Sequence, residues 1–455
     1  MAIPNDVLAL IGNTPMVEVR SFDTGPCRLF LKLECQNPGG SIKDRVALAM
    51  IEAAERDGLV ARRGTIVEAT AGNTGIGLAL VAGRKGYRLT LVIPDKMSRE
   101  KVFNLRAMGA EVVMTRSDVG KGHPEYYQDM AERIARECGG FYVNQFGNPA
   151  NPLAHERGTA PEIWEQMDHD VDAVVAGVGS GGTLAGLSRF FERVSPATGM
   201  VLADPAGSVL AEFVADGRIT RPAGSWLVEG IGEDFVPEIA DLSRVRQAIT
   251  VTDAEAFECG RALLRGEGIL AGSSTGVLLA AALRWCRAQT EPKRCVTLVP
   301  DSGNKYLSKM FNDFWMIDQG FVRREAHGDL TDLISRRHVE HATVCVAPDD
   351  AAHVAYARMK MYDVSQIPVC DGERIVGIVD ESDLLLAVFG HEDRFRRPVR
   401  EVMTTRLETL HPTAPVSALL PIFDRGLVAI VQDGERFLGL ITRIDLLNHL
   451  RRRMG

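Results

Sequence analysis

The feature that most constrains the fold is a regular alternation of apolar segments along residues 1–320. Segments rich in β-forming residues, such as GTIVEAT, YRLTLVIP and AEVVMT, alternate with helical, glycine-capped segments such as GIGLALVAGRKG and REKVFNLRAMG. The series VDAVVAGVG, GGTLAGLSRFFERV and GMVLADP repeats this order. Strands that alternate with helices along a chain form βαβ units, in which helices cover a parallel sheet. The sequence therefore predicts an α/β fold for this part of the chain.

The last third of the chain contains an internal repeat. IVGIVDESDLLLAV (375–388) aligns with FLGLITRIDLLNHL (437–450) at an offset of 62 residues. VCDGERIVG (369–377) matches VQDGERFLG (431–439) at the same offset. Two copies of a strand-turn-strand-helix unit predict a pseudo-symmetric pair that buries one face against the other.

The segment between the two parts, GFVRREAHGDLTDLISRRH, is polar and charged, and we interpret it as a linker. The expected division is therefore a first domain at 1–320, a linker at 321–335 and a second domain at 336–455. The basic run RFRRPVR (394–400) joins the two repeats. We interpret it as a solvated surface turn rather than a polyanion site.

Charge and cysteine usage exclude several classes of protein. A net charge of -8 argues against a nucleic-acid partner. No apolar run approaches the roughly 18 residues that span a bilayer, and MAIPNDVLALIGNTP lacks the features of a secretory signal, so we expect no membrane partner. The eight cysteines are scattered without a C-x-x-C pair, which favours reduced thiols in the cytoplasm. His338 and His341 lie close in sequence without a third ligand, so we expect no metal site.

The stretch GGSIKDR (39–45) places Lys43 in an unusual position. Two glycines and a serine predict a loop that ends in a helix N-cap, and the apolar segment VALAMIEAA follows as the helix. The partial positive charge at a helix N-terminus is unfavourable for a cation. Either the Lys43 amine is uncharged or covalently occupied, or its side chain extends to solvent beside Asp44.

Three glycine-rich loops each follow a predicted strand and open a predicted helix: TAGNTG (70–75), GVGSGGT (177–183) and AGSSTG (271–276). Backbone N–H groups at a helix N-terminus bind anions, and the four glycines of the second loop form a nest suited to phosphate. The second loop also satisfies G-x-G-x-x-G with Asp204 about one strand later, so a dinucleotide site is a rival interpretation. That rival gives no role to Lys43. A third reading is that each loop is merely a tight turn between strand and helix.

A lysine on a loop together with a separate phosphate nest suits pyridoxal phosphate. The lysine amine forms a Schiff base with the aldehyde of this cofactor, and the nest holds its phosphate. This hypothesis also explains why Lys43 is not a free cation.

Six segments of residues 1–320 resemble the pyridoxal-phosphate β-family, the group that contains cysteine synthase and cystathionine β-synthase. They are LIGNTPMVEV (10–19), LKLECQNPGGSIKDR (31–45), EATAGNTGIGLA (68–79), NQFGNPANPLAH (144–155), GVGSGGT (177–183) and LAGSSTG (270–276). VEGIGEDFVPEI (228–239) is more similar to the cystathionine β-synthases than to the cysteine synthases around Glu229 and Asp234. The C-terminal repeat resembles a tandem CBS, or Bateman, module.

The resemblance implies a fold-type II enzyme with two open, twisted, mainly parallel sheets flanked by helices, followed by an α/β CBS-domain pair. It implies a lyase that condenses L-serine with L-homocysteine to L-cystathionine, with hydrogen sulfide from cysteine as a side product. The alternative within enzymes is an O-acetylserine or O-phosphoserine sulfhydrylase with a regulatory tail. A different alternative is an adenosyl-ligand sensor with a vestigial catalytic half, against which intact Lys43, Asn73 and Ser274 argue.

The resemblance also implies roles for individual residues. Lys43 would carry the Schiff base and act as acid and base at Cα, Asn73 would hydrogen-bond the ring hydroxyl of the cofactor, and Ser274 would face its pyridine nitrogen. The phosphate would be bound by Gly179, Ser180, Gly181, Gly182 and Thr183. The substrate carboxylate would be bound by Thr70, Gly72, Thr74 and Gln145. Glu229 would meet the ammonium or thiol proton of homocysteine, or is a structural loop carboxylate.

Some positions depart from the family pattern. Ala71 stands where relatives often have serine, so one substrate hydrogen bond is expected to be missing. The haem-binding extension of animal relatives has no counterpart before LIGNTP, so we expect no haem. PAGSV, after Asp204, lacks the C-x-x-C of some relatives.

The two C-terminal repeats differ at one informative pair of positions. The second copy has Thr442 and Asp445, a pair that related modules use to bind a ribose, whereas the first copy has Asp380 and Asp383. We expect one site for S-adenosylmethionine or an adenine nucleotide near Thr442 and Asp445, with a ligand-free dimerisation module as the alternative. The resemblance implies a homodimer, and paired modules could build a homotetramer.

Overall fold

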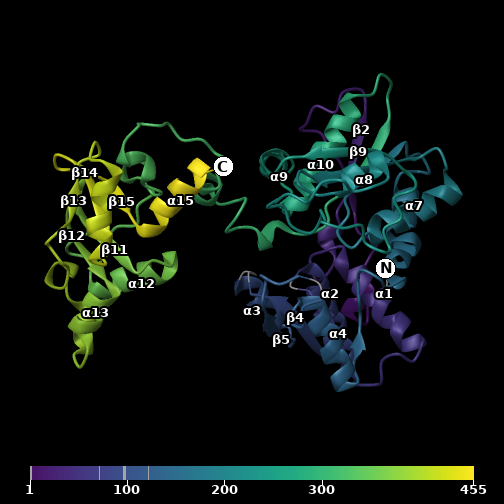
Figure 1. Ribbon diagram of the computed structural model, residues 1–455, viewed down its shortest axis with the longest axis horizontal. Helices are drawn as coiled ribbons and strands as arrows, with labels where there is room; N and C mark the ends of the chain where they lie inside the picture. Colours follow the sequence, from purple (N-terminus) through teal and green to yellow (C-terminus); the bar gives the residue numbers. More distant parts are fainter. Residues whose placement is uncertain (1–2, 71, 96–98, 121, 455) are drawn as a thin grey trace. The chain divides into compact units, whose positions relative to one another are not determined.

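The computed structural model describes residues 3–454 except 71, 96–98 and 121. The chain divides into two compact units, Met1–Phe311 and Asn312–Gly455 (Figure 1). Each unit has its own sheets and its own apolar core.

The larger sheet of the first unit has six strands in the order β1-β2-β10-β7-β8-β9. Only β1 runs antiparallel to its neighbour among these pairs; the other pairs are parallel. The strand bounds are Met16–Glu18 (β1), Arg28–Lys32 (β2), Ala173–Ala176 (β7), Gly199–Pro205 (β8), Val245–Val251 (β9) and Arg294–Leu298 (β10).

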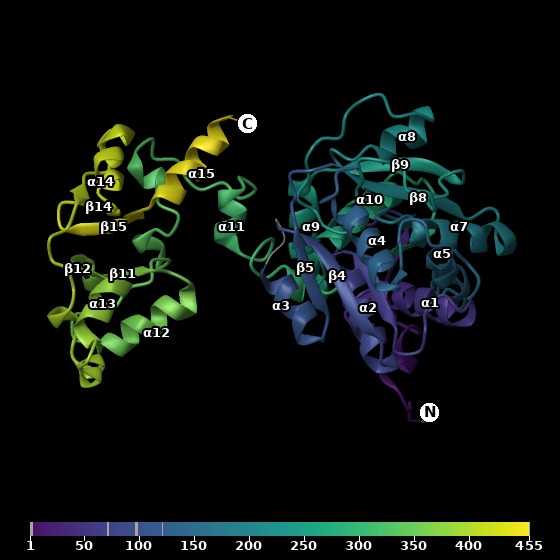
Figure 2. The ribbon, with the colours of Figure 1, turned by 60° about the horizontal axis from the view of Figure 1, so that its bottom comes forward.

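The smaller sheet of this unit has four parallel strands in the order β5-β4-β3-β6. Figure 2 shows β5 beside β4. They are Thr65–Ala69 (β3), Arg88–Pro94 (β4), Glu111–Thr115 (β5) and Phe141–Tyr142 (β6). In β4, every residue after Arg88 is buried, as expected for a parallel strand with both faces covered. Two mainly parallel sheets confirm the fold class predicted for this part of the chain.

The helices of the first unit come between these strands along the chain. Helix α1 packs against α2, and α4 packs on β3 and β4. The bounds are Lys43–Arg56 (α1), Asn73–Lys85 (α2), Arg99–Ala107 (α3), Tyr127–Cys138 (α4), Ala150–Ala154 (α5), Ala160–Gln166 (α6), Gly182–Val194 (α7), Leu210–Asp216 (α8), Asp253–Glu267 (α9) and Ser273–Arg287 (α10). The α2 segment matches the helix predicted from GIGLALVAGRKG and ends at Gly86 in a left-handed conformation, with φ of 77°.

The second unit contains the predicted repeat. The first copy comprises Gln366–Asp371 (β11), Arg374–Asp380 (β12) and Glu381–Val388 (α13), and the second comprises Ala429–Asp433 (β14), Arg436–Ile441 (β15) and Arg443–Met454 (α15). Both hairpins shift register at the same place, between Val369 and Cys370 and between Val431 and Gln432. The shared irregularity confirms that the copies are equivalent in structure.

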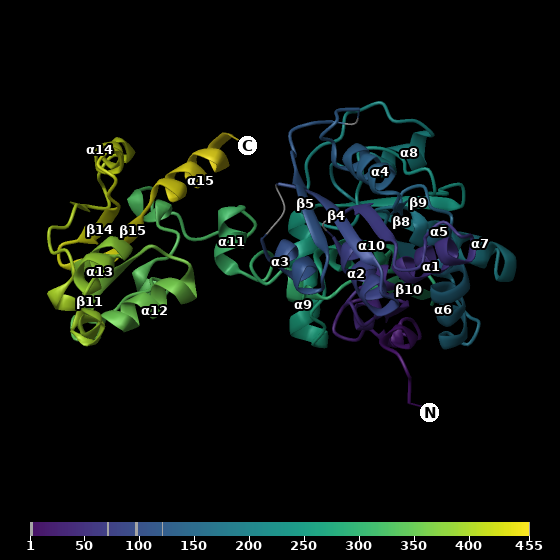
Figure 3. The same ribbon diagram turned by 90° about the horizontal axis from the view of Figure 1, so that it is seen from below.

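Four further α-helices and strands lie in the described part of this unit, and the first of them precedes both copies. They are Asp313–Asp318 (α11), Ala352–Tyr362 (α12), Thr409–Leu410 (β13) and Leu420–Asp424 (α14), with α12 beside α13 (Figure 3). Leu330, Leu333 and Ile334, which the sequence analysis assigns to the linker, are buried in the core of the second copy. Polar and charged residues surround these three apolar ones, so the polarity of the whole segment conceals them. The boundaries 1–320, 321–335 and 336–455 stay a prediction.

No helix within the described ranges is both long enough and apolar enough to cross a membrane.

Candidate active site

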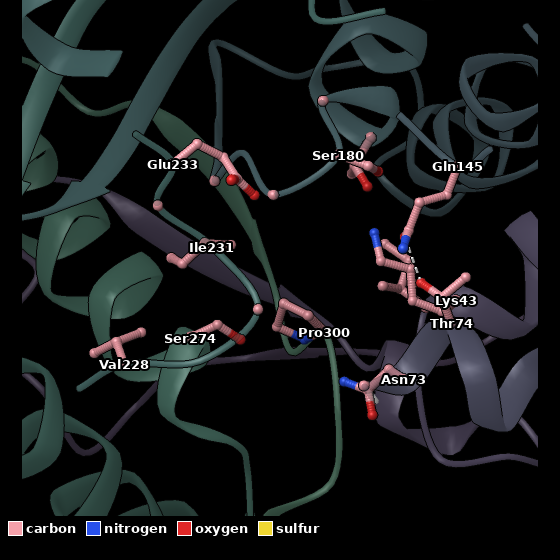
Figure 4. Close-up of a pocket in the computed structure, with 18 of the residues that line it drawn as sticks. Lys43, Asn73, Thr74, Gln145, Ser180, Val228, Ile231, Glu233, Ser274 and Pro300 are labelled. Atoms are coloured by element: carbon pink, nitrogen blue, oxygen red, sulfur yellow. Dashed lines mark hydrogen bonds between the residues drawn. The ribbon is translucent and has the colours of Figure 1, made fainter. Parts of the chain in front are cut away.

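A cavity of about 250 Å³ in the first unit brings most of the predicted site residues together (Figure 4). Figure 4 shows Lys43, Thr74 and Gln145 on one side of the cavity and Val228, Ile231 and Glu233 on the other. The predicted residues that line it are Lys43, Thr70, Gly72, Asn73, Thr74, Gln145, Gly179, Ser180, Gly181, Thr183 and Ser274. They come from segments far apart in the sequence.

Lys43 is the first residue of α1, and its side chain borders the cavity. The Ser41 hydroxyl accepts the Lys43 backbone N–H at 3.2 Å, and Asp44 accepts the N–H of Gly39 at 2.5 Å. Asp44 is itself buried, so Lys43 does not extend to solvent beside it. Burial lowers the pKa of the Lys43 amine to about 8, partly offset by the charge of Glu233. The amine is therefore a better nucleophile near neutral pH than an exposed lysine.

The position of α1 depends on a close approach between helices. A Cβ at Gly77 in α2 would lie 2.8 Å from the Lys43 carbonyl oxygen. Only glycine allows this distance, so Gly77 fixes the start of α1 against α2.

The loop 177–183 contains glycines that have no room for a side chain. Any larger residue would force neighbouring atoms to move. A Cβ at Gly179 would lie 2.5 Å from the Gly230 carbonyl oxygen. Gly181 has φ of 90°, and a Cβ there would lie 2.5 Å from the Cβ of Ala240. This loop is a tight cradle of backbone at the N-terminus of α7, a geometry that binds phosphate.

Two side chains behind this loop orient its hydroxyl groups. The Asn151 amide donates to Ser180 Oγ at 2.9 Å, so Ser180 can direct its own proton elsewhere. The buried His155 ring has Nε2 3.2 Å from Thr183 Oγ1 and Nδ1 3.0 Å from Thr159 Oγ1. Burial holds the pKa of His155 well below its usual value, so the ring is neutral.

The first turn of α2 and the loop before it also contribute polar groups to the cavity. Thr74 donates to Gln145 Oε1 at 2.7 Å, which leaves the Gln145 amide N–H groups to face the cavity. The Thr70 hydroxyl accepts the N–H of Gly72 at 3.2 Å. Ala71, the predicted departure from the family pattern, lies outside the described residues.

Asn73 already has partners in this structure. Its amide nitrogen donates to Asp301 at 2.8 Å, and its amide oxygen accepts from Lys305 at 2.5 Å. The amide carries two N–H groups, and the contact with Asp301 uses one of them. Asn73 can therefore still donate to a ligand.

Ser274 lies in the first turn of α10 and is buried against the cavity. A Cβ at the preceding Gly272 would meet Asp301 Oδ1 at 1.9 Å. The third glycine loop thus packs on the carboxylate that also contacts Asn73, and it serves the same cavity rather than a separate one.

Glu233 is a cavity residue that the sequence analysis did not select. Burial raises the pKa of its carboxyl to about 8, against the opposing charge of Lys43. It lies within VEGIGEDFVPEI, where only Glu229 and Asp234 were singled out. Glu229 and Glu233 are close in sequence, and the sequence does not indicate which carboxylate faces the cavity.

Glu229 lines a neighbouring cavity of about 610 Å³ instead, which shares Gly72, Asn73 and Gly230 with the first. Its carboxylate accepts from Lys309 at 2.6 Å and pairs with Lys101. These two lysines hold the pKa of Glu229 below its usual value despite burial. Glu229 is therefore an ionised group in a charged wall.

Three further predicted residues lie away from the first cavity or play another part. Gly182 begins α7 behind the loop, where a Cβ would lie 2.0 Å from Asn151 Oδ1. Thr442 and Asp445 line a cavity of about 680 Å³ in the second unit. There Asp445 accepts from Thr442 Oγ1 at 2.5 Å and from Ser335.

The rival dinucleotide interpretation finds no support at Asp204. This carboxylate is buried and accepts the Ala211 N–H in α8 at 2.9 Å, and burial raises its pKa to about 6. A residue that binds a ribose needs an accessible carboxylate.

Other residues that support the site also escaped the sequence analysis: Asn151, His155 and Asp301. Asn151 and His155 belong to NQFGNPANPLAH, a segment quoted for the family resemblance without a role for either residue. Their contacts join residues 28 or 29 positions apart, which no local pattern reveals.

Comparison with known families assigns both units. Residues 7–301 match the pyridoxal-phosphate dependent enzymes, and residues 331–390 and 399–452 each match the CBS domain.

Curated relatives match nearly the whole chain. It is 34% identical over 471 residues to the cystathionine beta-synthase of Dictyostelium discoideum, covering 98% of this chain and 92% of the relative. It is 38% identical over 498 residues to the cystathionine beta-synthase of Saccharomyces cerevisiae, covering 98% of each.

A solved structure is also similar to this chain. A hydrogen sulfide-producing enzyme from Fusobacterium nucleatum is 37% identical, with a TM-score of 0.62, and covers 67% of this chain and all of its own (100%).

Proposed function

The chain belongs to the pyridoxal-phosphate-dependent enzymes, in the group of the cystathionine β-synthases, and on this premise we propose that it condenses L-serine with L-homocysteine to L-cystathionine and water. The observation that carries the proposal is the Lys43 amine, with its lowered pKa, in one cavity with the glycine cradle 177–183.

The residues present fit pyridoxal phosphate. A cradle at Gly179 and Gly181 that a Cβ would fill can receive a phosphate, and an amine with pKa near 8 can condense with an aldehyde. When bound, this cofactor supplies that aldehyde and an electron-withdrawing ring for the substrate Cα. We assign the phosphate to Gly179, Ser180, Gly181, Gly182 and Thr183, the ring hydroxyl to Asn73 and the pyridine nitrogen to Ser274. We propose that no haem takes part.

Lys43 moves the proton at Cα. Its neutral amine removes the proton from serine and later returns one to the product. The Cβ–O bond breaks and the homocysteine sulfur forms the new bond at Cβ, while the thiol proton balances the proton that the hydroxyl needs to leave as water. Thr70, Gly72, Thr74 and Gln145 bind the serine carboxylate, which holds the Cα–H bond toward Lys43.

Homocysteine binds at the neighbouring cavity. Its wall presents Glu229 together with Lys101 and Lys305, and these charges complement the ammonium and carboxylate of an amino acid. Glu229 meets the ammonium group. Because the two cavities share Gly72 and Asn73, a thiol bound in one can reach a substrate bound in the other.

The first experiment compares two reactions of the cofactor-loaded protein by mass spectrometry. One contains L-serine and homocysteine, and the other contains O-acetylserine and sulfide. Rapid cystathionine formation with slow cysteine formation supports the proposal. Rapid cysteine formation without cystathionine supports the alternative, an O-acetylserine or O-phosphoserine sulfhydrylase.

Lys43→Ala gives a second test. We expect this variant to lose turnover and to retain the cofactor through loop 177–183. Near-normal turnover by Lys43→Ala would contradict the proposal. Release of hydrogen sulfide from cysteine is a predicted side activity, supported by similarity to the Fusobacterium enzyme.

The second unit is proposed as a regulatory site for S-adenosylmethionine or an adenine nucleotide near Thr442 and Asp445. The support is the cavity of about 680 Å³ that both residues line. In the first copy Asp380 and Asp383 bind each other's backbone N–H groups as a capping box. A second carboxylate at the position of Thr442 disfavours a phosphate there. Equilibrium dialysis with each ligand tests this assignment.

We also propose a cytoplasmic homodimer or homotetramer. The eight cysteines carry no disulfide, which suits a reducing compartment. Light scattering with and without the adenosyl ligand distinguishes the two assemblies.

A further inference from the structure

One cluster of metal-binding side chains in the second unit has no part in the function above. It consists of His338, Cys345 and Cys370, whose ligand atoms all lie within 4.8 Å of one another. His338 Nδ1 lies 3.8 Å from Cys345 Sγ. His338 and Cys345 are seven positions apart, and the pairing of the Cys345 segment with β11 brings Cys370 to them.

Backbone pairing sets the two cysteines side by side. The Val346 N–H donates to the Pro368 carbonyl at 3.1 Å, and the Cys370 N–H donates to the Val346 carbonyl at 2.9 Å. The register shift after Val369 then reorients Cys370 relative to the rest of β11.

The His338 ring is held by packing against the other repeat. It lies over the Phe437 ring, with centroids 5.0 Å apart and an angle of 47° between the planes. Phe437 and Cys370 share an apolar cluster with Ile375 and Ile430, to which both repeats contribute. His338, Cys345 and Cys370 therefore lie where the two repeats meet. A metal bound there would hold the two repeats together.

The donor set is selective. Two thiols and one imidazole are the ligands of zinc and of other thiophilic cations, whereas magnesium and calcium prefer oxygen. With a Zn–S bond of about 2.3 Å, ligands of a tetrahedral site lie roughly 3.5–4 Å apart. Small side-chain rotations bring the three atoms to that spacing.

We propose that His338, Cys345 and Cys370 bind one thiophilic divalent cation of the zinc class, with water in the fourth position. Binding releases the two thiol protons to solvent and forms two metal–sulfur bonds and one metal–nitrogen bond, without a change of oxidation state. The inference departs from the expectation of no metal, which rested on His338 and His341 alone.

The segments that carry Cys345 and Cys370 also form part of the regulatory cavity. Thr343 and Val344 before Cys345, and Gln366 and Pro368 before Cys370, line the cavity that holds Thr442 and Asp445. Metal binding thus fixes two segments of that wall.

The test uses the untagged, cofactor-loaded full chain, reduced and stripped of metal. Cobalt(II) is the probe, because thiolate ligands give it strong charge-transfer absorption, and zinc then competes for the site. We expect one equivalent of cobalt with two thiolate ligands, and displacement by one equivalent of zinc. Cys345→Ser, Cys370→Ser and His338→Asn should each weaken binding by about 100-fold or more.

Matched controls separate this site from other thiols. Cys138 is exposed, and Cys286 lies near Cys27, whose Sγ donates to the Cys286 carbonyl at 3.4 Å. Cys138→Ser and Cys286→Ser should leave cobalt binding unchanged, as should His341→Asn. Far-UV circular dichroism and thermal unfolding check that each variant is folded.

Three results would overturn the proposal. One is the absence of a cobalt–thiolate band in the reduced protein. Another is an unchanged band in both Cys345→Ser and Cys370→Ser. The last is a thiol count showing that Cys345 and Cys370 stay joined as a disulfide under the reducing conditions of the test.

Discussion

Replacing Gly181 by alanine tests whether loop 177–183 is the phosphate cradle. Gly181 has φ of 90°, and its Cβ would lie 2.5 Å from the Cβ and 2.8 Å from the Cα of Ala240. A side chain in left-handed backbone costs about 1–2 kcal/mol, and forcing a methyl group into packed atoms costs about 1–3 kcal/mol more.

The loop must keep this conformation when it holds a phosphate, whereas the apoprotein can relax it. The cost therefore falls mainly on cofactor binding. Since about 1.4 kcal/mol is a factor of ten in an equilibrium constant, Gly181→Ala should weaken pyridoxal phosphate binding by about 30-fold or more.

The assay is a titration of the apoprotein with pyridoxal phosphate, followed by absorbance, together with thermal unfolding of the same samples. Gly83→Ala is the matched control, because Gly83 lies in α2 with nothing within 4 Å of its added Cβ. It should bind the cofactor normally and gain up to about 1 kcal/mol of stability. Normal cofactor affinity in Gly181→Ala would refute the cradle, even if its unfolding temperature fell.

Three other predictions follow from the site. His155→Leu should weaken cofactor binding about tenfold, because the Thr183 hydroxyl loses its partner; titration of the double variant with Thr183→Ala should show no additive loss, and additivity would contradict a shared contact. Glu229→Gln should raise the KM for homocysteine about tenfold with the KM for serine unchanged, and steady-state kinetics showing equal changes for both would remove Glu229 from the homocysteine site. Burial raises the pKa of Glu68 from 4.5 to about 7, so the folded state holds this proton more tightly than the unfolded state, and wild-type stability should fall by about 3 kcal/mol as pH rises through that interval. Glu68→Gln should lack that part of the pH dependence in urea unfolding; identical pH slopes would refute it.

A buried ion network beside Lys43 explains why the GGSIKDR segment ends in arginine. Arg45 donates to Glu34 at 2.7 Å and to Glu162 at 2.6 Å, and Lys32 donates to Glu162 at 2.7 Å. These contacts tie α1 to β2 and α6. The sequence motif thus contains both the reactive amine and an ion pair that holds its helix.

Residues that are neighbours in one sequence motif line different cavities. Glu229 and Glu233 are four positions apart, yet one carboxylate pairs with two lysines and the other faces Lys43. Residues 229–233 include two glycines with positive φ, Gly230 and Gly232, which turn the backbone between the carboxylates. A local pattern cannot predict which side chain enters which cavity after such turns.

The sequence by itself determined what local interactions encode. The periodicity of apolar residues and the glycines that end helices are properties of neighbouring residues. They predicted the parallel sheets and helix α2, and internal similarity predicted the repeat with its offset of 62 residues. The motifs around Lys43, Gly181 and Ser274 located segments that line one cavity.

Only the tertiary structure decided which distant residues touch. His155 reaches Thr183, Asp301 reaches Asn73 across 228 positions, and Cys345 meets Cys370. Each contact depends on how separate elements pack, since its free energy is gained only after loops of many residues have closed. Local sequence patterns therefore cannot predict such pairs.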